Sequence, residues 1–328
     1  MTRRSGTGPE PAGGRPAPPI RLAYRPARPE DLRACTEIWS AGIGDYVRRL
    51  NQPWFEGDPE PLRRLLAHFL RTDPERFRVA VDQSAGDRVV GYASATLRGD
   101  AWFLGMLFVL PELHARGVGR TLLEQVMPRQ TAADHDRIAM ATAADSVQPV
   151  ANALYSQYGM VPRLPIFNFV GRPERLQVLP GLPPGIRIAE WSADSTGADV
   201  EAASTIDTRV LGREHPLDHA FLMAEGRRRF IARSEQGEPV GYGYIAPSGR
   251  FGPVAALERR LLAPIAAHLI TTVQARGAYA TWVPGAADEL FLMLLQAGFR
   301  FESFPALLLW DRPVADFSRY VPINLALL

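Results

Sequence analysis

The fold is decided by one stretch of the chain, Phe103-Leu-Gly-Met-Leu-Phe-Val-Leu-Pro-Glu-Leu-His-Ala-Arg-Gly-Val-Gly-Arg-Thr-Leu-Leu123. Its apolar run 104–110 predicts a buried strand, which Pro111 ends because proline cannot donate to a sheet. The apolar residues from Val118 onward recur at helical spacing and predict an amphipathic helix. Glycines between the two let backbone amides approach a ligand, and the unpaired amides of a helix N-terminus favour an anion. The stretch predicts a phosphate-binding turn, although a tight turn without a ligand has the same local pattern.

Two common phosphate-binding motifs are excluded here. The dinucleotide fingerprint needs a third glycine where Leu122 stands, and the Gly-Lys-Ser/Thr of a P-loop is absent. The segment Val109-Leu-Pro-Glu-x-x-x-Arg-Gly-Val-Gly-Arg-x-Leu-Leu123 instead resembles the acetyl-CoA-binding motif of the GNAT superfamily of N-acetyltransferases. His114 stands where that family has Gln or Arg. The resemblance implies that the amides of residues 114–120 bind the pyrophosphate of the coenzyme.

A second segment, Asn152-Ala-Leu-Tyr-Ser-Gln-Tyr-Gly-Met160, resembles the helix that follows in the same family. The resemblance implies that Asn152 contacts the pantetheine arm and that Tyr155 protonates the leaving thiolate. A phenol with a pKa near ~10 can donate that proton; the alternative is a packed aromatic side chain. The residues that the resemblance assigns to acetyl-CoA are Phe108, Val109, His114, Ala115, Arg116, Gly117, Val118, Gly119, Arg120, Thr121 and Asn152.

The chain is long enough, at 328 residues, for two domains. We predict a Gly- and Pro-rich disordered tail over 1–19, a GNAT domain over 20–170, a linker over 171–185 and a degenerate GNAT-like domain over 186–328. The predicted order of elements in the first domain is β-α-α-β-β-β-α-β-α-β, closed by a hairpin through 165–170. The expected fold class is therefore α/β, with two tandem GNAT folds built on mixed sheets.

The second half resembles a weak repeat of the first. Residues 252–257 echo 105–110, and at that offset Gly117 falls on Pro264. Proline has no N–H and a fixed φ, so we expect this copy of the turn to be lost and the second domain not to bind coenzyme A.

The general base is not evident from the sequence, because no acid lies between Ala101 and Leu110. Four loop carboxylates could reach the cleft, although each is also typical of a solvated surface acid: Glu56, Asp58, Asp100 and Asp145.

No metal site is predicted. His215 and His219 have a spacing that suits a metal on a helix, but we expect Pro216 to break that helix and leave a polar loop.

We predict an acyltransferase that moves the acetyl group of acetyl-CoA directly to a primary amine of a small molecule. Protein N-terminal or lysine acetylation and a non-catalytic acyl-CoA-binding regulator stay as alternatives. The net charge of +2 gives no support for a nucleic-acid partner, and no apolar run reaches the ~18 residues of a membrane span. The single Cys35 fits a reducing cytoplasm and gives no case for a covalent intermediate. A homodimer is left open.

Overall fold

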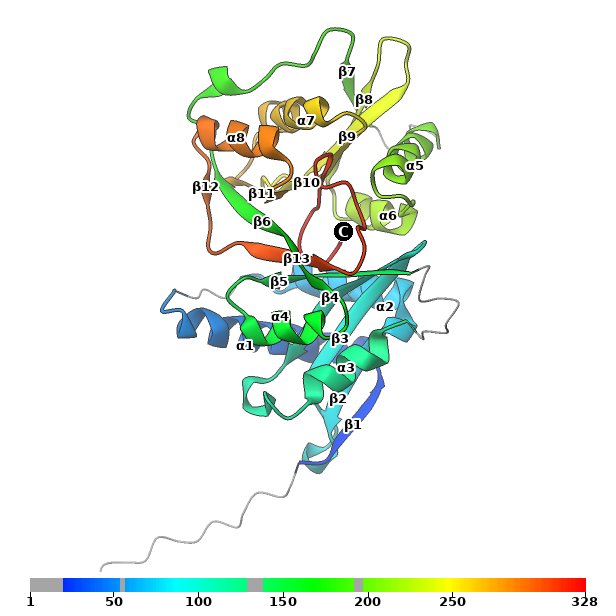
Figure 1. Ribbon diagram of the computed structural model, residues 1–328, viewed down its shortest axis with the longest axis vertical. Coiled ribbons are helices and arrows are strands. Elements are labelled where there is room, and N and C mark those ends of the chain that lie inside the picture. Colours follow the sequence, from blue (N-terminus) through cyan, green and yellow to red (C-terminus); the bar gives the residue numbers. More distant parts are fainter. Residues whose placement is uncertain (1–19, 54–56, 129–137, 192–196) are drawn as a thin grey trace, which may run out of the picture.

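The computed structural model describes residues 20–328 apart from 54–56, 129–137 and 192–196, so the predicted tail lies outside the described residues. The expected order of elements in the first half is confirmed (Figure 1). Its elements are β1 (Leu22–Pro26), η1 (Pro29–Asp31), α1 (Leu32–Arg49), α2 (Glu60–Thr72), η2 (Pro74–Arg76), β2 (Phe77–Asp82), η3 (Gln83–Ala85), β3 (Arg88–Arg98), β4 (Ala101–Val109), η4 (Pro111–Leu113), α3 (Val118–Val126), β5 (Ala139–Asp145), α4 (Pro149–Ser156) and β6 (Val161–Gly171).

The second half repeats this order after a connecting segment, which confirms the internal repeat. Its elements are η5 (Leu176–Val178), β7 (Arg187–Glu190), α5 (Ala198–Val210), α6 (Pro216–Ala224), β8 (Arg228–Arg233), β9 (Pro239–Ile245), β10 (Phe251–Ala256), α7 (Arg259–Thr272), β11 (Tyr279–Pro284), α8 (Asp288–Ala297), β12 (Arg300–Phe301), β13 (Ala306–Trp310) and β14 (Tyr320–Val321).

The two halves exchange a strand. One sheet runs β1-β2-β3-β4-β5-β13-β6-β11, and a second runs β14-β10-β9-β8-β7. Strand β13, from the second half, pairs antiparallel with β5, while β6, from the first half, pairs with β11 (Figure 1). The two exchanged strands also pair with each other. The hairpin expected through 165–170 is therefore wrong, and a boundary at residue 170 separates strands that share one sheet.

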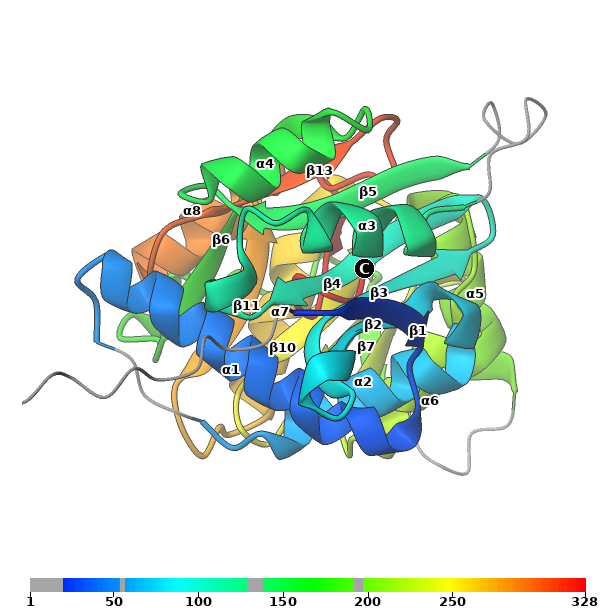
Figure 2. The same cartoon turned by 90° about the horizontal axis from the view of Figure 1, so that it is seen from below.

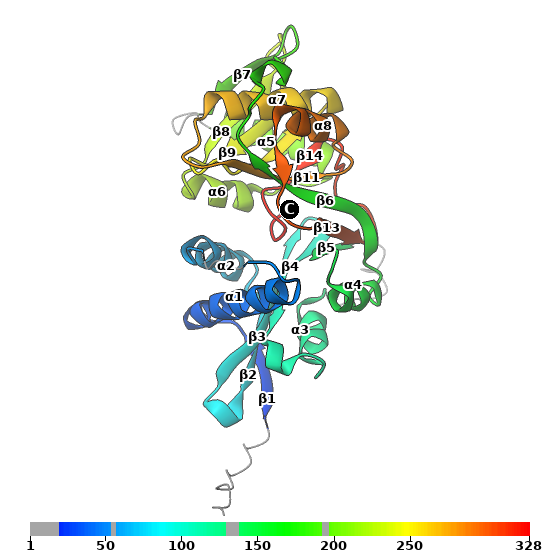
Figure 3. The same cartoon turned by 90° about the vertical axis from the view of Figure 1, so that its left-hand side faces the viewer.

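Helices cover both faces of the first-half sheet. Helices α1 and α2 lie on one face and α3 on the other, as the views from below and from the side show (Figures 2 and 3). These helices pack on the sheet through their apolar faces. The side chains at most 1% exposed include Leu66 and Phe69 of α2 and Leu122 and Leu123 of α3. Cys35 of α1 is fully buried in the same core.

The C-terminal segment also packs on the first half. Residues 323–328 follow β14, and the carbonyl oxygen of Ala326 lies so close to β4 that a Cβ on Gly105 would be 2.6 Å from it. Leu327 and Leu328 are buried in the same core cluster as α2 and β4. Among the described helices, none combines the length and the hydropathy that crossing a membrane would require.

Because β5 and β6 both depend on β13, we predict that residues 20–171 do not fold cooperatively alone. The fragment would leave one edge of β5 and both edges of β6 without partners. Thermal unfolding followed by circular dichroism should give one transition for the full chain and none for the fragment. A fragment that melts cooperatively near the Tm of the full chain would contradict this dependence.

Candidate active site

Strands β4 and β5 diverge at the centre of the first-half sheet. They pair in parallel only from Ala101 with Ala139 to Leu104 with Thr142. Beyond that point β5 continues beside β13, and β4 continues beside β3 only. The register of β4 against β3 shifts between Met106 and Leu104, which is the mark of a bulge that bends the strand. Residues 105–109 of β4 therefore have one edge that no described strand covers.

The strand register shows which backbone groups of β4 face the gap. The amide of Leu110 donates to Val90 of β3 at 2.9 Å, and alternation along an antiparallel pair then turns the N–H and C=O of Phe108 toward β3 as well. The groups that face the gap are those of Leu107 and Val109. In agreement, the carbonyl of Val109 is 2.9 Å from Nε2 of the His114 ring. Phe108 contributes its ring instead, stacked 5.8 Å from that of Tyr92.

The predicted turn, residues 114–120, leads into the N-terminus of α3, and the amide of His114 already donates to the carbonyl of Pro111 at 3.2 Å. Ala115 (φ 61°) and Gly117 (φ 80°) both have left-handed backbone, and Gly117 is the N-cap of the helix. No side chain of the described residues caps this end. The first amides of a helix have no intrahelical partner, so they stay available to an anion at the positive end of the helix dipole. We call residues 114–120 the anion cradle.

Two side chains beside the cradle have different surroundings. Arg116 is exposed at the rim. Arg120 is tied to the end of α4, where it donates to Gln157 and, over 3.1 Å, to the hydroxyl of Tyr158. The hydroxyl of Thr121 donates to the carbonyl of Gly117 at 3.3 Å. Arg120 therefore fixes α3 against α4, and Arg116 is the charge left facing solvent at the cradle.

Asn152 fastens α4 to the end of β5. Its amide nitrogen donates to the carbonyls of Asp145 and Gln148 at 2.9 and 2.8 Å. Its Oδ1 is buried and has no hydrogen-bond partner among the described residues. An unpaired buried acceptor is unfavourable unless a ligand satisfies it, so this oxygen is suited to an amide N–H of a bound molecule.

Tyr155 lies on the same helix and is 6% exposed. Burial raises the pKa of its phenol above the ordinary value, which keeps the hydroxyl protonated at neutral pH. A neutral phenol is the form that can give up a proton to a stronger base.

Of the four carboxylates weighed from the sequence, Asp145 is the one that the structure sets apart. It is the last residue of β5, partly buried beside the hydroxyl of Tyr46 on α1, and burial raises its pKa. The Tyr46 hydroxyl is itself buried without a hydrogen bond of good geometry. Asp58 and Asp100 are exposed, and Glu56 lies outside the described residues. Tyr46 carries no sequence motif and could not have been selected from the pattern of α1.

The corresponding turn of the second half is shorter than predicted. Residues 110–117 connect β4 to α3, whereas only residues 257–258 connect β10 to α7. The expected alignment of Gly117 with Pro264 is therefore wrong, because Pro264 lies inside α7. The loop that would form a second cradle is absent from between these two elements.

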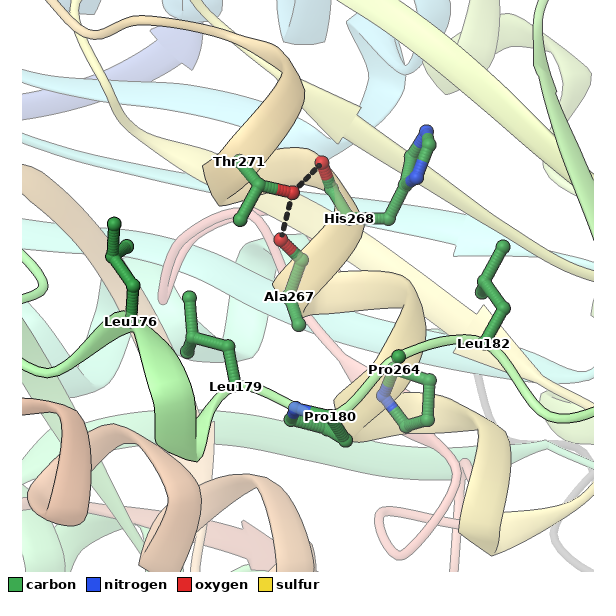
Figure 4. A pocket seen from close by; sticks show the side chains of 9 residues that line it. Leu176, Leu179, Pro180, Leu182, Pro264, Ala267, His268 and Thr271 are labelled. Carbon is green, nitrogen blue, oxygen red and sulfur yellow. Dashed lines mark hydrogen bonds between the residues drawn. The ribbon is translucent and has the colours of Figure 1, made fainter.

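The connecting segment instead packs over the second-half helices. A cavity of about 210 Å³ lies between residues 176–182 and the face of α7 that carries Pro264, Ala267 and Thr271 (Figure 4). The amide of Glu174 donates to the carbonyl of Ala297 at the end of α8. The segment thus crosses α7 and α8, the counterparts of the two helices that carry the anion cradle, Asn152 and Tyr155.

His215 and His219 lie away from this site, and the predicted break between them is wrong. Pro216 is the first residue of α6, where a missing N–H has no cost, so the helix begins there instead of ending. His215 is the N-cap and His219 follows one turn later, with the two rings stacked 4.5 Å apart.

Comparison with known proteins agrees with this geometry. The model of the acetyltransferase (GNAT) family matches residues 44–160, from α1 to just beyond α4. No curated protein matches the chain.

Among solved structures, a provisionally assigned acetyltransferase from Pyrococcus horikoshii has a TM-score of 0.70 at 16% identity, covering 94% of this chain and 96% of its own. A GCN5-related N-acetyltransferase from Sphaerobacter thermophilus has a TM-score of 0.60 at 18% identity, covering 92% and 99%. A tandem GNAT protein from the clavulanic acid biosynthesis pathway has a TM-score of 0.55 at 16% identity, covering 89% and 99%. Identities this low show the fold, which is two tandem GNAT folds in one chain.

If the anion cradle binds the coenzyme, Gly117→Pro should weaken acetyl-CoA binding by about 100-fold or more. Proline cannot adopt φ 80° and removes an amide, a misfit of roughly 3 kcal/mol. Gly197→Pro is the matched control, since Gly197 is also a helix N-cap but has φ −30° and open space around it. Calorimetry should give one acetyl-CoA per chain for wild type and the control. Two bound per chain, or equal binding by both variants, would contradict the assignment.

Proposed function

We propose that the chain is an N-acetyltransferase that transfers the acetyl group of acetyl-CoA directly to a primary amine of a small molecule. The observation that carries the proposal is the uncovered edge of β4 over residues 105–109, next to the uncapped N-terminus of α3. A strand edge can pair with the amides of a pantetheine arm, and a helix N-terminus can hold the pyrophosphate at its end.

In this proposal each coenzyme contact has its own group on the chain. The anion cradle takes the pyrophosphate, with Arg116 at its rim. The gap-facing backbone of Leu107 and Val109 pairs with the arm, and Oδ1 of Asn152 accepts from one of its amides. For Val109 this pairing requires that the His114 ring release the carbonyl it now contacts.

The chemistry needs a proton acceptor, a proton donor and a donor for the oxyanion. The amine attacks the thioester carbonyl, whose developing charge is stabilised by the gap-facing N–H of Val109. Asp145 accepts the proton that the amine nitrogen loses. As the C–S bond breaks, Tyr155 gives its proton to the thiolate, and the phenolate is later reprotonated by water. The raised pKa of both groups suits these roles, because Asp145 binds a proton more tightly and Tyr155 stays protonated until the thiolate forms.

The surroundings of Asp145 favour a small cationic acceptor. A carboxylate attracts an ammonium group, and it can accept the proton that the nitrogen loses after the neutral amine has attacked. The β4 strand is covered on the α2 side by the C-terminal segment at Ala326, which leaves less room there for a folded protein substrate. A regulator that only binds acyl-CoA would need neither Asp145 nor Tyr155.

We further propose that the second half has no coenzyme site. The two-residue connection between β10 and α7 cannot present the run of amides that residues 114–120 offer. The segment 176–182 covers α7 in its place.

Replacing Tyr155 with Phe should lower kcat about 100-fold and leave the Kd for coenzyme A unchanged, since only the proton donor is lost. Tyr158→Phe is the matched control, because Tyr158 lies one turn later, is only half-buried and bonds Glu124 and Arg120. Free-thiol release with a panel of amines measures both. A regulator would release no thiol with any amine, and equal turnover by the two variants would remove Tyr155 from the mechanism.

The role proposed for Asp145 predicts how kcat/KM depends on pH. Its pKa is raised, so the carboxylate is protonated and inactive over a wider acid range, and kcat/KM should fall as pH drops through that raised value. Asp145→Asn should lower kcat/KM about 100-fold and abolish this limb. Measuring the profile with two acceptor amines of different pKa distinguishes a fall in kcat/KM caused by the enzyme from one caused by protonation of the amine. If the pH at which kcat/KM falls changes only with the pKa of the amine, and the fall persists in Asp145→Asn, Asp145 is excluded as the base.

A further inference from the structure

A second cluster of chemically active side chains lies apart from the acyltransferase site, in the second half of the chain. Asp207 of α5, His215 at the N-cap of α6 and His219 of α6 are at most 2% exposed. Each offers one ligand atom, and these atoms all lie within 4.8 Å of one another. Three buried groups of the types that bind metals therefore converge on one point.

The shared carboxylate brings the two imidazoles together. Oδ2 of Asp207 is 2.7 Å from Nε2 of His219 and 3.2 Å from Nε2 of His215. Both ring nitrogens of His215 are buried, and neither makes a hydrogen bond of acceptable geometry with the described residues. Hydrogen bonding within the chain thus accounts for His219 but leaves a buried imidazole without a partner, which proteins rarely tolerate.

The second polar atom of each of the three side chains, which faces away from the point of convergence, lies near a further polar group. The hydroxyl of Tyr244 is 2.7 Å from Nδ1 of His219, and that of Tyr242 donates to Oδ1 of Asp207 at 2.6 Å. Oδ2 of Asp218 lies 3.9 Å from Nδ1 of His215. Outer partners of this kind fix the orientation of imidazole and carboxylate ligands in metal centres.

Charged side chains surround the cluster. Three buried carboxylates, those of Asp73, Asp207 and Asp218, face two guanidinium groups, those of Arg98 and Arg213. A bound cation at the three-ligand point would lie against carboxylates rather than against the arginines, since Arg98 is already paired with Asp73 and Asp218.

The geometry points to a binding site for a divalent transition metal, with Zn²⁺ the best fit, formed by Asp207, His215 and His219. Two imidazole nitrogens and one carboxylate oxygen suit Zn²⁺ or a neighbouring first-row metal and disfavour Mg²⁺ and Ca²⁺, which take oxygen ligands. Ligand atoms about 2.0–2.2 Å from a tetrahedral ion lie roughly 3.3–3.6 Å from each other. The present separations from Oδ2 of Asp207, 2.7 Å to His219 and 3.2 Å to His215, would therefore have to widen by less than about 1 Å.

The site would join α5 to α6 and fix the surface where the two halves meet. Asp218, on the same helix as His219, receives two bonds of 2.9 Å from Arg98 of β3 and lies 2.7 Å from His68 of α2. Because α5 and α6 lie away from the anion cradle, Asn152 and Tyr155 (Figure 1), we assign the ion to holding the two helices together and not to acyl transfer.

The test uses the full chain, stripped with a chelator and titrated with Co²⁺ and Zn²⁺. We expect one equivalent of Co²⁺ to give a visible ligand-field spectrum, Zn²⁺ to displace it, and either ion to raise the Tm. His215→Gln should abolish the spectrum, and it is the least disruptive change because His215 makes no good hydrogen bond in the chain. His268→Gln is the matched control, a partly exposed histidine on α7 outside the cluster.

Two results would overturn the inference. The first is a folded wild-type chain that binds neither ion stoichiometrically. The second is a Co²⁺ spectrum that persists unchanged in His215→Gln, or one that is lost equally in His268→Gln.

Discussion

The pairing of β13 with β5 is the constraint on which the rest of the structure depends. Strand β5 has to leave β4 after Thr142 to open the gap, and a strand that leaves one neighbour needs another. Strand β13 supplies it over Ala306–Trp310, and β6 then closes the far side of β13. The first-half site is thus held open by a strand whose residues follow their partners in β5 by 161 to 169 positions, and neither half completes its own sheet.

A buried ionic network fixes the halves at a second place. Arg98 of β3 bonds Asp73 at 2.8 Å and Asp218 of α6 at 2.9 Å, and all three are under 10% exposed. Charges buried in this way are costly unless every one is paired, so removing one partner destabilises more than the intact pair stabilises. The network therefore fixes the orientation of α6 on the first half more than it adds to stability, and a wrong docking would leave a buried charge without its partner.

The local features of the fold and site could be predicted from the sequence, because they follow from local rules. Helix and strand order follows from apolar periodicity, and the positive φ of Gly117 follows from glycine before a helix. The strand exchange could not be predicted, since antiparallel pairing of β6 with β13 or with β5 satisfies the same apolar pattern. The alignment of Gly117 with Pro264 failed for a related reason. Similarity between the strands of the two halves does not determine the length of the loop that follows each strand. Asp145 differs from a surface acid only through its burial beside Tyr46, which depends on the packing of α1.

The two halves share the strands of the fold but differ in the turn before the third helix. The sheet is retained in both, because each half needs the other's last strand and a lost strand would leave an unpaired edge. The turn before the third helix is under no such constraint. In the second half it consists of residues 257–258 alone, and β10 and α7 still pack on each other, with buried residues at Ile265 and Leu269. The second half contributes to the first site mechanically, since it provides β13, Ala326 and the docking of α6.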